Sequence, residues 1–391
     1  MVTFIQKNGF VDVERNPFEL SEIKGMGHPD TLSDSMAALI SLLYSNYCIK
    51  NYGRILHHNI DKVAIAGGRS SPKFGGGRIE IPAKVLFIGR AIREVGGNVI
   101  PLEKFAKECV NKISLNNVGL KFKPDFSIKY VKRGSTDLIK NYENNNTPKA
   151  NDTSFGTAWY PLSKLENTII NVESFLQGIR KKEKFLGSDI KIMGRRLKNE
   201  VLLNVAAAFI DEEIRSMREY VSLKEELILR ISQEFGVQKE NILINTADTK
   251  NEAYITVTGT SAECGDDGQV GRGNRGNGVI SPGRPMTLEA IGGKNPNKHI
   301  GNFYNVWAYR IAKKICEEFN VKTDVQIVST IGKPITECDL LVRTSEEISK
   351  QRASEICEEV INNYAKITED IVNGKIKMYP FKLINNFVKK Y

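Results

Sequence analysis

The sequence has no long hydrophobic run, which argues against a membrane-spanning protein. Of its 391 residues, 41% are hydrophobic and 26% are charged, a balance that is ordinary for globular proteins. No apolar stretch approaches the roughly 20 residues that cross a bilayer. The first residues, Met1-Val-Thr-Phe-Ile-Gln-Lys7, lack the layout of a signal peptide. We therefore expect a cytoplasmic protein with no membrane partner.

Cysteine and histidine are scarce and are not spaced as metal ligands. The six cysteines show no CxxC spacing, so we expect reduced thiols. Cys264 lies in the glycine-rich stretch described below, but nothing nearby marks it as a nucleophile, and we expect a core position. No HExxH pattern supports zinc. We interpret His57, His58 and His299 as substrate-binding or structural hydrogen-bonding groups.

The sequence also lacks the familiar signatures of nucleic-acid binding. Its net charge of +10 admits a polyanionic partner. However, the lysines are spread along the chain and often alternate with glutamates, as in Lys224-Glu-Glu. No RNP-like aromatic motif and no zinc-finger spacing are present. We expect a solvated lysine-rich surface and no nucleic-acid partner.

What the sequence does contain is a glycine-rich stretch from Gly259 to Gly301. Its charged residues include Asp266, Asp267, Arg272, Arg275, Arg284, Lys294 and Lys298. Glycines let the backbone approach a ligand and expose N–H groups, while Arg and Lys supply the charge that a polyphosphate needs. Composition alone favours a flexible basic surface loop. The strand-like and helix-like flanks and the spaced carboxylates favour an anion site instead, although neither a P-loop nor a GxGxxG fingerprint is present.

Hydrophobic periodicity predicts helices and strands mixed along the chain, without a sharp linker. Helices are expected at 36–47, 102–113, 162–180, 201–220, 223–235, 303–319 and 346–372. Strands are expected at 62–66, 78–82, 84–88, 242–245, 254–258 and 325–331. The Asn- and Lys-rich segment 137–149 indicates a surface loop. His28 and Asp30 come just before the first helix, where the dipole and free N–H groups favour an anion.

Several motifs resemble one known family, and they occur in the family's order. TGTSAECGDDGQVGRGNRGNG and GGKNPNKHIG, with the earlier GMGHPDTLSD, HHNIDK, GGRSSPKFGGG, ANDTSFG and SDIKIMG, resemble the archaeal-type S-adenosylmethionine synthetases (methionine adenosyltransferases). The resemblance runs from about Glu14 to about Arg343. It implies an α+β fold in which one compact chain forms three similar interleaved units about a pseudo-threefold axis, with boundaries that the sequence does not resolve. It also implies a Mg²⁺-dependent homo-oligomer, dimer or tetramer, with active sites between subunits.

The implied reaction is S-adenosylmethionine synthesis from ATP and L-methionine. The methionine sulfur attacks C5′ of ATP and expels tripolyphosphate, which is then hydrolysed to pyrophosphate and phosphate. A thioether has no proton to lose, so the enzyme must align the reactants and stabilise charge on the leaving group rather than supply a general base. Such a site needs Lys, Arg and Mg²⁺, with carboxylates for the metal and the methionine ammonium.

The resemblance implies roles for individual residues of this chain. Four are expected to be catalytic through contacts with the leaving group and phosphates, namely His28, Lys191, Arg272 and Lys294. Asp30 is the expected metal ligand. The expected substrate-binding residues are Glu22, Asp152, Phe155, Asp189, Asp266 and Lys298. Taken alone, His28 and Asp30 are also typical of a helix cap, and Lys191 of a solvated polar turn.

Three positions depart from the bacterial branch of this family. Arg69 follows Gly67-Gly68 where that branch has a glutamate, and its positive charge disfavours a potassium ion. Ile300 replaces a metal-binding aspartate, so a second Mg²⁺ is expected to use phosphate and water oxygens. Gly273 replaces a lysine, for which Arg275 is the expected substitute.

Three other functions remain open from the sequence. Within enzymes, these are a relative acting on another thioether or nucleoside triphosphate, and a polyphosphatase that keeps only the hydrolytic half. Outside enzymes, a nucleic-acid-binding protein would use the Gly/Arg stretch, and its binding would weaken steeply with salt.

Overall fold

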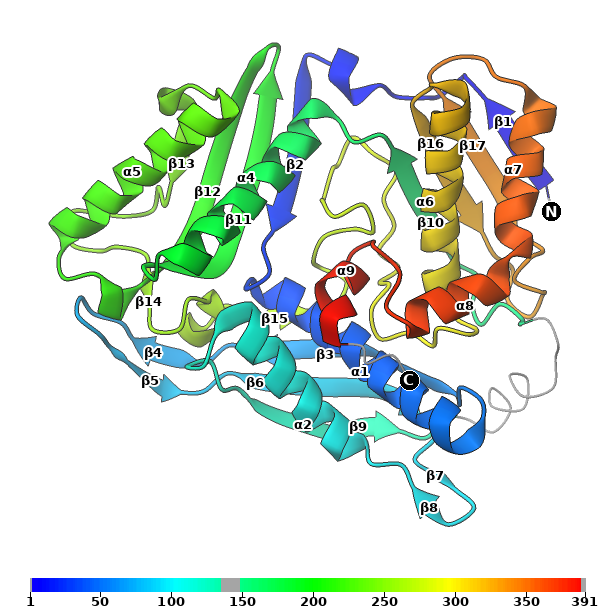
Figure 1. Ribbon diagram of the computed structural model, residues 1–391, viewed down its shortest axis with the longest axis horizontal. Helices are drawn as coiled ribbons and strands as arrows, with labels where there is room; N and C mark the ends of the chain where they lie inside the picture. The colour runs from blue at the N-terminus through cyan, green and yellow to red at the C-terminus, as the bar shows by residue number, and fades with distance from the viewer. Residues whose placement is uncertain (1, 135–147, 388–391) are drawn as a thin grey trace.

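Three mixed β-sheets form the protein, and each has helices packed against one face (Figure 1). The computed structural model describes residues 2–134 and 148–387. The expected mixed α+β class is therefore confirmed. The predicted surface loop at 137–149 falls mainly outside the described residues.

The first sheet lies at the right of Figure 1 and pairs the N-terminal strand with strands from distant parts of the chain. Its strands, in spatial order, are β1 (Val2–Gln6), β17 (Asp339–Thr344), β16 (Thr323–Val328) and β10 (Phe155–Tyr160). β1 is parallel to β17, and the other pairs are antiparallel. Helix α6 (Ile300–Phe319) packs on β10 and β16, and α7 (Lys350–Asn362) contacts both α6 and β1.

The second sheet lies at the upper left of Figure 1. Its main path is β13 (Ile242–Ile244), β12 (Glu200–Ile210), β11 (Leu186–Leu197) and β2 (Phe18–Lys24), with β14 (Ile255–Thr256) also paired to β12. Helix α4 (Lys164–Lys182) covers β11 and β2. It begins with a capping box, in which Ser163 and Glu166 satisfy each other's backbone N–H groups. Helix α5 (Met217–Phe235) packs on β13 and α4.

The third sheet lies at the bottom of Figure 1. Its strands are β15 (Gly268–Gln269), β3 (His58–Ala66), β6 (Lys84–Ala91) and β9 (Asp125–Lys132). Helices α1 (Pro29–Tyr52) and α2 (Leu102–Ile113) pack on β3 and β9 respectively and also contact each other. Two short hairpins are also present. One pairs β4 (Arg69–Ser71) with β5 (Arg78–Ile81), and the other pairs β7 (Glu94–Val95) with β8 (Asn98–Val99).

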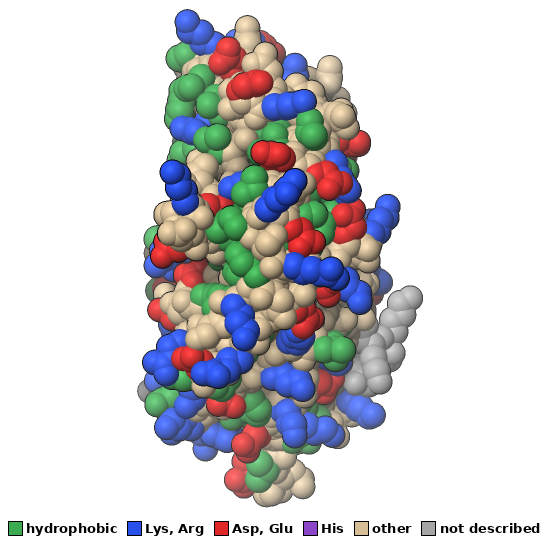
Figure 2. Space-filling view, turned by 90° about the vertical axis from the view of Figure 1, so that its left-hand side faces the viewer, with side chains coloured by type: hydrophobic (Ala, Val, Ile, Leu, Met, Phe, Trp, Pro, Cys, Tyr) green, Lys and Arg blue, Asp and Glu red, His purple; other side chains and the backbone are tan. Residues whose placement is uncertain are grey.

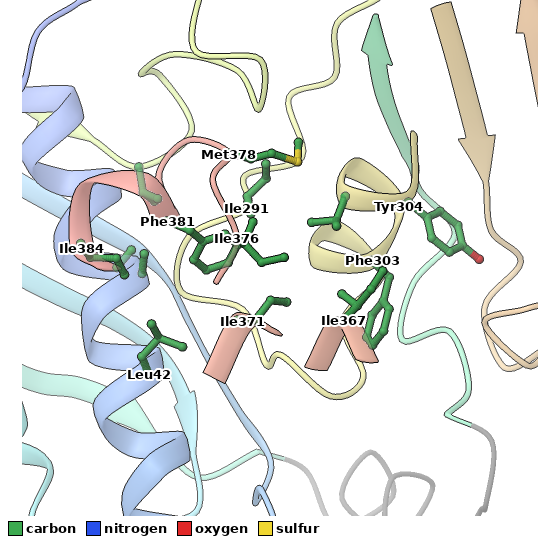
Figure 3. Packing of buried hydrophobic residues seen from close by; sticks show 14 of the residues in the cluster. Leu42, Ile291, Phe303, Tyr304, Ile367, Ile371, Ile376, Met378, Phe381 and Ile384 are labelled. Atoms are coloured by element: carbon green, nitrogen blue, oxygen red, sulfur yellow. The ribbon is translucent and has the colours of Figure 1, made fainter. Parts of the chain in front are cut away.

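Two hydrophobic clusters form the core. The smaller joins the second sheet to α4 and α5, and the larger joins the other two sheets and their helices. The C-terminal segment belongs to the larger cluster, which also holds α8 (Tyr364–Val372) and α9 (Phe381–Ile384). Figure 3 shows side chains of this segment packed between α1, α6 and α8. Residues 376–384 are thus packed against the helix whose N-terminus carries His28.

Several expected elements match the structure, including α2 at its full length and the shorter strands β5 and β13. The helix predicted at 201–220 is wrong. β12 occupies its first half, and α5 begins only at Met217. The alanine run 206–208 favours a helix locally, but this segment lies between β11 and the β13 and β14 strands, where sheet pairing and burial decide the conformation.

The predicted helix at 346–372 is also wrong as a single element. α7 starts at Lys350 after its cap Ser349, and Asn363 separates it from α8 with φ −89° and ψ 36°. The glycine-bracketed segment 187–194, where we weighed a polar turn, lies inside strand β11. None of the helices in residues 2–134 and 148–387 is long and apolar enough to cross a bilayer.

Figure 2 shows the edge of the molecule that lies at the left of Figure 1. Basic, acidic and apolar side chains are interspersed over this face, with basic ones more frequent toward its lower end. On this face, the interspersed side chains form a mixed, solvated surface. They do not form a continuous basic stripe of the kind that follows a nucleic-acid backbone.

Candidate active site

A pocket of about 660 Å³ lies where β2, β11 and the start of α1 meet the third sheet and the glycine-rich stretch. This volume is within the range of small-molecule sites. Its charged and ionisable lining side chains are Lys24, His28, Asp30, Lys191, Asp266, Asp267 and Arg272. The pocket therefore brings together five residues that the sequence predicts for a site, although they are spread over about 240 positions of the chain.

His28 is held as a neutral hydrogen-bond donor. It is the N-cap of α1, where its Nδ1 accepts from Asp30 N at 3.2 Å. This bond assigns the ring hydrogen to Nε2. Burial lowers the pKa of His28 to about 4, and the charges of Lys24 and Lys191 add to the shift while Asp30 opposes it. At neutral pH the imidazole is uncharged, and its Nε2–H can donate to an anion.

Asp30 and Lys24 form the base of the pocket. Lys24 Nζ lies 2.8 Å from Asp30 Oδ2 and donates to Arg272 O at 2.8 Å. The backbone N–H of Gln269 donates to Asp30 Oδ1 at 2.9 Å. Sequence reasoning missed Lys24, and the available signal was its place in KGMGH, immediately before the glycines that lead to His28.

Lys191 enters the pocket from the neighbouring strand. The antiparallel register of β2 and β11 pairs Lys191 with Lys24 and Met193 with Glu22. Glu22 Oε1 lies 3.7 Å from the Nζ atoms of both lysines. The Lys191 side chain is 41% exposed, which leaves it accessible to a ligand. Strand pairing, rather than a polar turn, thus sets the position of this lysine.

Asp189 lies behind the pocket. Its Oδ2 accepts from Ser261 N at 2.8 Å and from Ser261 Oγ at 2.6 Å, and the same hydroxyl lies 3.0 Å from Asp266 Oδ2. Burial raises the pKa of Asp189 to about 7. Asp189 therefore supports the segment that carries Asp266, whereas Asp266 is exposed and lines the pocket.

The core position predicted for Cys264 is wrong, since Cys264 is exposed on the segment that carries Asp266.

The glycine-rich stretch is packed against the rest of the site rather than free on the surface. A Cβ at Gly268 would lie 2.3 Å from Pro29 O, so only glycine allows this approach. The Asn274 side chain exchanges hydrogen bonds of 2.9 Å with both Lys24 N and Lys24 O. Gly67 N donates to Asp267 Oδ1 at 2.8 Å. These contacts contradict the flexible surface loop that composition favours.

Arg275 does not replace the lysine for which we expected it to substitute. Its guanidinium donates to the carbonyl oxygens of Gly271, Gly273 and Thr287. It lines a separate cavity of about 20 Å³ instead of the large pocket. Arg275 thus fixes the shape of the stretch, and Arg272 is the arginine that lines the pocket.

A second pocket of about 430 Å³ adjoins the first and shares Gln269 with it. Lys294 and Phe155 line this second pocket. Lys294 Nζ lies 2.9 Å from Asp61 Oδ2 and also pairs with Glu289. Burial alone would lower the pKa of Lys294, but the two carboxylates outweigh it and the pKa is raised. The lysine stays charged, and sequence reasoning missed both of its partners.

Four expected substrate-binding residues line neither pocket: Glu22 and Asp189 interact with residues that do, whereas Asp152 and Lys298 lie apart from them. Asp152 is exposed, with its Oδ1 accepting from Thr153 N at 2.8 Å, and Lys298 is half-buried. His58 and His299 are buried in structural hydrogen bonds, to Ser41 Oγ and to the N-terminus of α6. Within the described part of the chain, no group of three or more His, Cys, Asp or Glu residues could hold a metal ion.

The α+β fold and a pocket lined by lysine, arginine, neutral histidine and aspartate define an enzyme-like site for a polyanionic substrate. Comparison with protein-family models then gives the family. The model of S-adenosylmethionine synthetase (AdoMet synthetase) matches residues 2–375, and the chain belongs to this family. The resemblance expected from the sequence motifs is confirmed.

Curated relatives agree over nearly their whole length. The S-adenosylmethionine synthase of Archaeoglobus fulgidus is 40% identical over 396 residues, which cover 96% of this chain and 99% of the relative. That of Thermoplasma volcanium is 38% identical over 389 residues, covering 94% and 97%. A probable S-adenosylmethionine synthase of Aquifex aeolicus is 40% identical over 358 residues, covering 87% and 89%.

Proposed function

We propose that this protein synthesises S-adenosylmethionine from ATP and L-methionine, expels tripolyphosphate from C5′, and hydrolyses it to pyrophosphate and phosphate. The observation that carries this proposal is the neutral His28 donor beside Lys24, Lys191 and Arg272 in one pocket. In an SN2 displacement by sulfur, negative charge develops on the departing phosphate oxygen. Donors fixed in advance around that position lower the barrier without a general base.

Each residue of the pocket has a distinct part in this proposal. His28 Nε2–H donates to the departing oxygen, and Lys191 binds the phosphate next to the reacting carbon. Arg272 binds the phosphate chain, while Lys294 holds its outer end from the adjoining pocket. Asp266 binds the methionine ammonium or the ribose, with Glu22 positioning the two lysines through its 3.7 Å contacts.

Mg²⁺ fits the donor set of this site. Mg²⁺ is usually held by one or two carboxylates and by substrate phosphates rather than by an all-protein cage. Each oxygen of Asp30 accepts one hydrogen bond, from Lys24 or Gln269, and keeps a lone pair for a cation. Bound there with ATP, Mg²⁺ would neutralise phosphate charge. Arg69 pairs with Glu80 at 2.8 Å, which supports the view that its position holds no potassium ion.

A second copy of the chain completes the site in this proposal. In residues 2–134 and 148–387, helices pack against one face of each sheet, and the other faces carry exposed hydrophobic side chains, such as Phe18 paired with Leu197 and Ile88 paired with Tyr130. Lys191 lies on the same face of its sheet as Leu197, because residues of equal parity along a strand share a face. The pocket is therefore continuous with an apolar surface suited to self-association.

Self-association would give Asp152 and Lys298, which line neither pocket, a place at the site of a neighbouring subunit. It also accords with three sheet-and-helix units arranged about a pseudo-threefold axis, which we propose as the domain organisation. A monodisperse monomer with full activity would contradict the shared active site.

The direct test is to incubate the purified protein with ATP, methionine and Mg²⁺ and to measure products by mass spectrometry and phosphate assay. We expect S-adenosylmethionine, pyrophosphate and phosphate in equal amounts. Phosphate without S-adenosylmethionine would instead identify a polyphosphatase. No turnover, with RNA or DNA binding that weakens steeply with salt, would favour the nucleic-acid function.

A further inference from the structure

Behind the pocket, Asp34 joins helix α1 to the glycine-rich stretch and to the C-terminal segment. Its carboxylate is buried, with the residue 3% exposed. Oδ1 accepts from Gly271 N at 2.8 Å, and Oδ2 accepts from Tyr379 Oη at 2.6 Å. One side chain thus receives a donor from each of two segments that are far apart in the sequence.

Tyr379 holds the glycine-rich stretch at two points. Besides its hydroxyl bond to Asp34, its backbone N–H donates to Gly276 O at 3.2 Å. The residues around it anchor the segment in the larger hydrophobic cluster. Figure 3 shows the side chains of this anchor, which include Ile376, Met378, Phe381 and Ile384. The tyrosine is therefore presented to the stretch by a packed segment.

The backbone at 271–273 rests directly on the Asp34–Tyr379 pair. A Cβ at Gly273 would lie 2.1 Å from Asp34 Oδ2 and 2.4 Å from Tyr379 Oη. Arg272 lies between the two glycines of this contact. Its carbonyl oxygen accepts from Lys24 Nζ at 2.8 Å, and its side chain lines the large pocket. The backbone around Arg272 is thus held by Asp34 at Gly271 N and by Lys24 at Arg272 O.

We propose that Asp34 and Tyr379 are positioning residues that hold residues 271–273 so that Arg272 meets the phosphate chain, which makes the C-terminal segment part of the active-site structure. This inference rests on the proposed phosphate-binding role of Arg272. Arg272 itself is exposed and long, so it loses side-chain entropy on binding. A backbone that is fixed before binding limits that loss to the side chain.

Tyr379→Phe removes one hydroxyl and keeps the ring. Asp34 then loses a donor in a buried site, and the backbone at 271–273 is free to shift. We expect inorganic tripolyphosphate, measured by titration calorimetry with Mg²⁺, to bind roughly 5- to 20-fold more weakly. The methionine KM should stay at the wild-type value, because Asp266 is held separately by Ser261.

Tyr44→Phe is the matched control. Tyr44 is a buried tyrosine of the larger hydrophobic cluster, and its hydroxyl donates to Ile92 O at 2.8 Å, away from the pocket lining. Its loss should lower the melting temperature without changing tripolyphosphate affinity. Equal affinities for the Tyr379→Phe and Tyr44→Phe variants would overturn the positioning role.

A double-mutant cycle separates positioning from general stability. In an Arg272→Ala background, Tyr379→Phe should cause no further loss of tripolyphosphate affinity, because the group that it positions is gone. An undiminished loss there would overturn the proposal. Asp34→Asn, which keeps the shape of the side chain, gives the same cycle if Tyr379→Phe does not fold. A wild-type protein that makes no S-adenosylmethionine and binds no tripolyphosphate would overturn the proposed function and this inference together.

Discussion

Replacing His28 with asparagine tests whether a neutral imidazole stabilises the leaving group. His28 has two separable roles, since Nδ1 caps α1 and the Nε2–H faces the pocket. An asparagine oxygen can accept the N–H of Asp30 and preserve the cap, but the shorter side chain withdraws the distal donor. The substitution therefore removes the proposed catalytic contact with little damage to the helix.

The expected magnitude follows from the loss of one donor to a developing anion. Such a donor is worth about 10²- to 10³-fold in kcat. We expect a fall of this size in the single-turnover rate of S-adenosylmethionine formation, measured by rapid quench at saturating ATP and methionine. ATP affinity should change much less, because the lysines and Arg272 remain in the pocket.

The pH dependence supplies a second, independent readout. Burial lowers the folded-state pKa of His28 from 6.5 to about 4, so the wild-type rate should show no acid limb near pH 6.5 from this residue. Because the unfolded state binds the proton first, stability should fall as the pH drops from 6.5 toward 4, by about 3 kcal/mol in all. His28→Asn should lack that component of the denaturation profile.

His58→Asn is the control, because burial lowers the pKa of His58 to about 4 as well, and His58 lies outside the pocket lining. It should lower stability and leave the chemical rate in place. A rate loss below tenfold for His28→Asn, or a wild-type acid limb near pH 6.5 that disappears in this variant, would refute the neutral-donor reasoning.

Three further substitutions probe other groups of the site. Lys191→Ala should lower the single-turnover rate of alkyl transfer more than ATP affinity, and an unchanged rate would remove Lys191 from the mechanism. Asp266→Asn should raise the methionine KM first, whereas unaltered methionine saturation would reassign the residue. Asp189→Asn concerns stability. Burial raises the folded pKa of Asp189 from 3.8 to about 7, so wild-type stability should decline as pH rises between these values. The variant should lack that slope in urea denaturation, and identical slopes would contradict the account.

Sequence patterns predicted helices and strands correctly where the local signals agree with the tertiary contacts. The capping box of α4 and the amphipathic period of α2 mark both helices. β12 could not be assigned in this way, because its alanines favour a helix and two of its three partners, β13 and β14, are separated from it along the chain. Prediction from local propensity fails at such a strand, since pairing with β11, β13 and β14 determines its state.

The site residues show the same limit. Composition and motifs singled out Asp266, Arg272 and His28, which the fold brings to one pocket. Asp189 and Lys191 are two positions apart, and a regular strand would turn both to one face. Asp189 is buried because the segment 259–261 covers it, with Asp189 N donating to Gly259 O and Ser261 donating to its carboxylate, whereas Lys191 lines the pocket. This contact joins residues about 70 positions apart, so no local sequence pattern predicts it.

The charge balance of the large pocket bears on what it can bind. Three basic side chains and three carboxylates line it, and His28 adds no charge at neutral pH. The excess of positive charge on the chain is therefore not concentrated at the site, and the net charge of +10 is a poor guide to its location. A ligand that itself carries both signs, such as a polyphosphate with a divalent cation, can satisfy the lysines and the aspartates together. A free polyanion would leave Asp30, Asp266 and Asp267 facing like charge, which supports the proposal that the substrate polyphosphate binds together with a divalent cation.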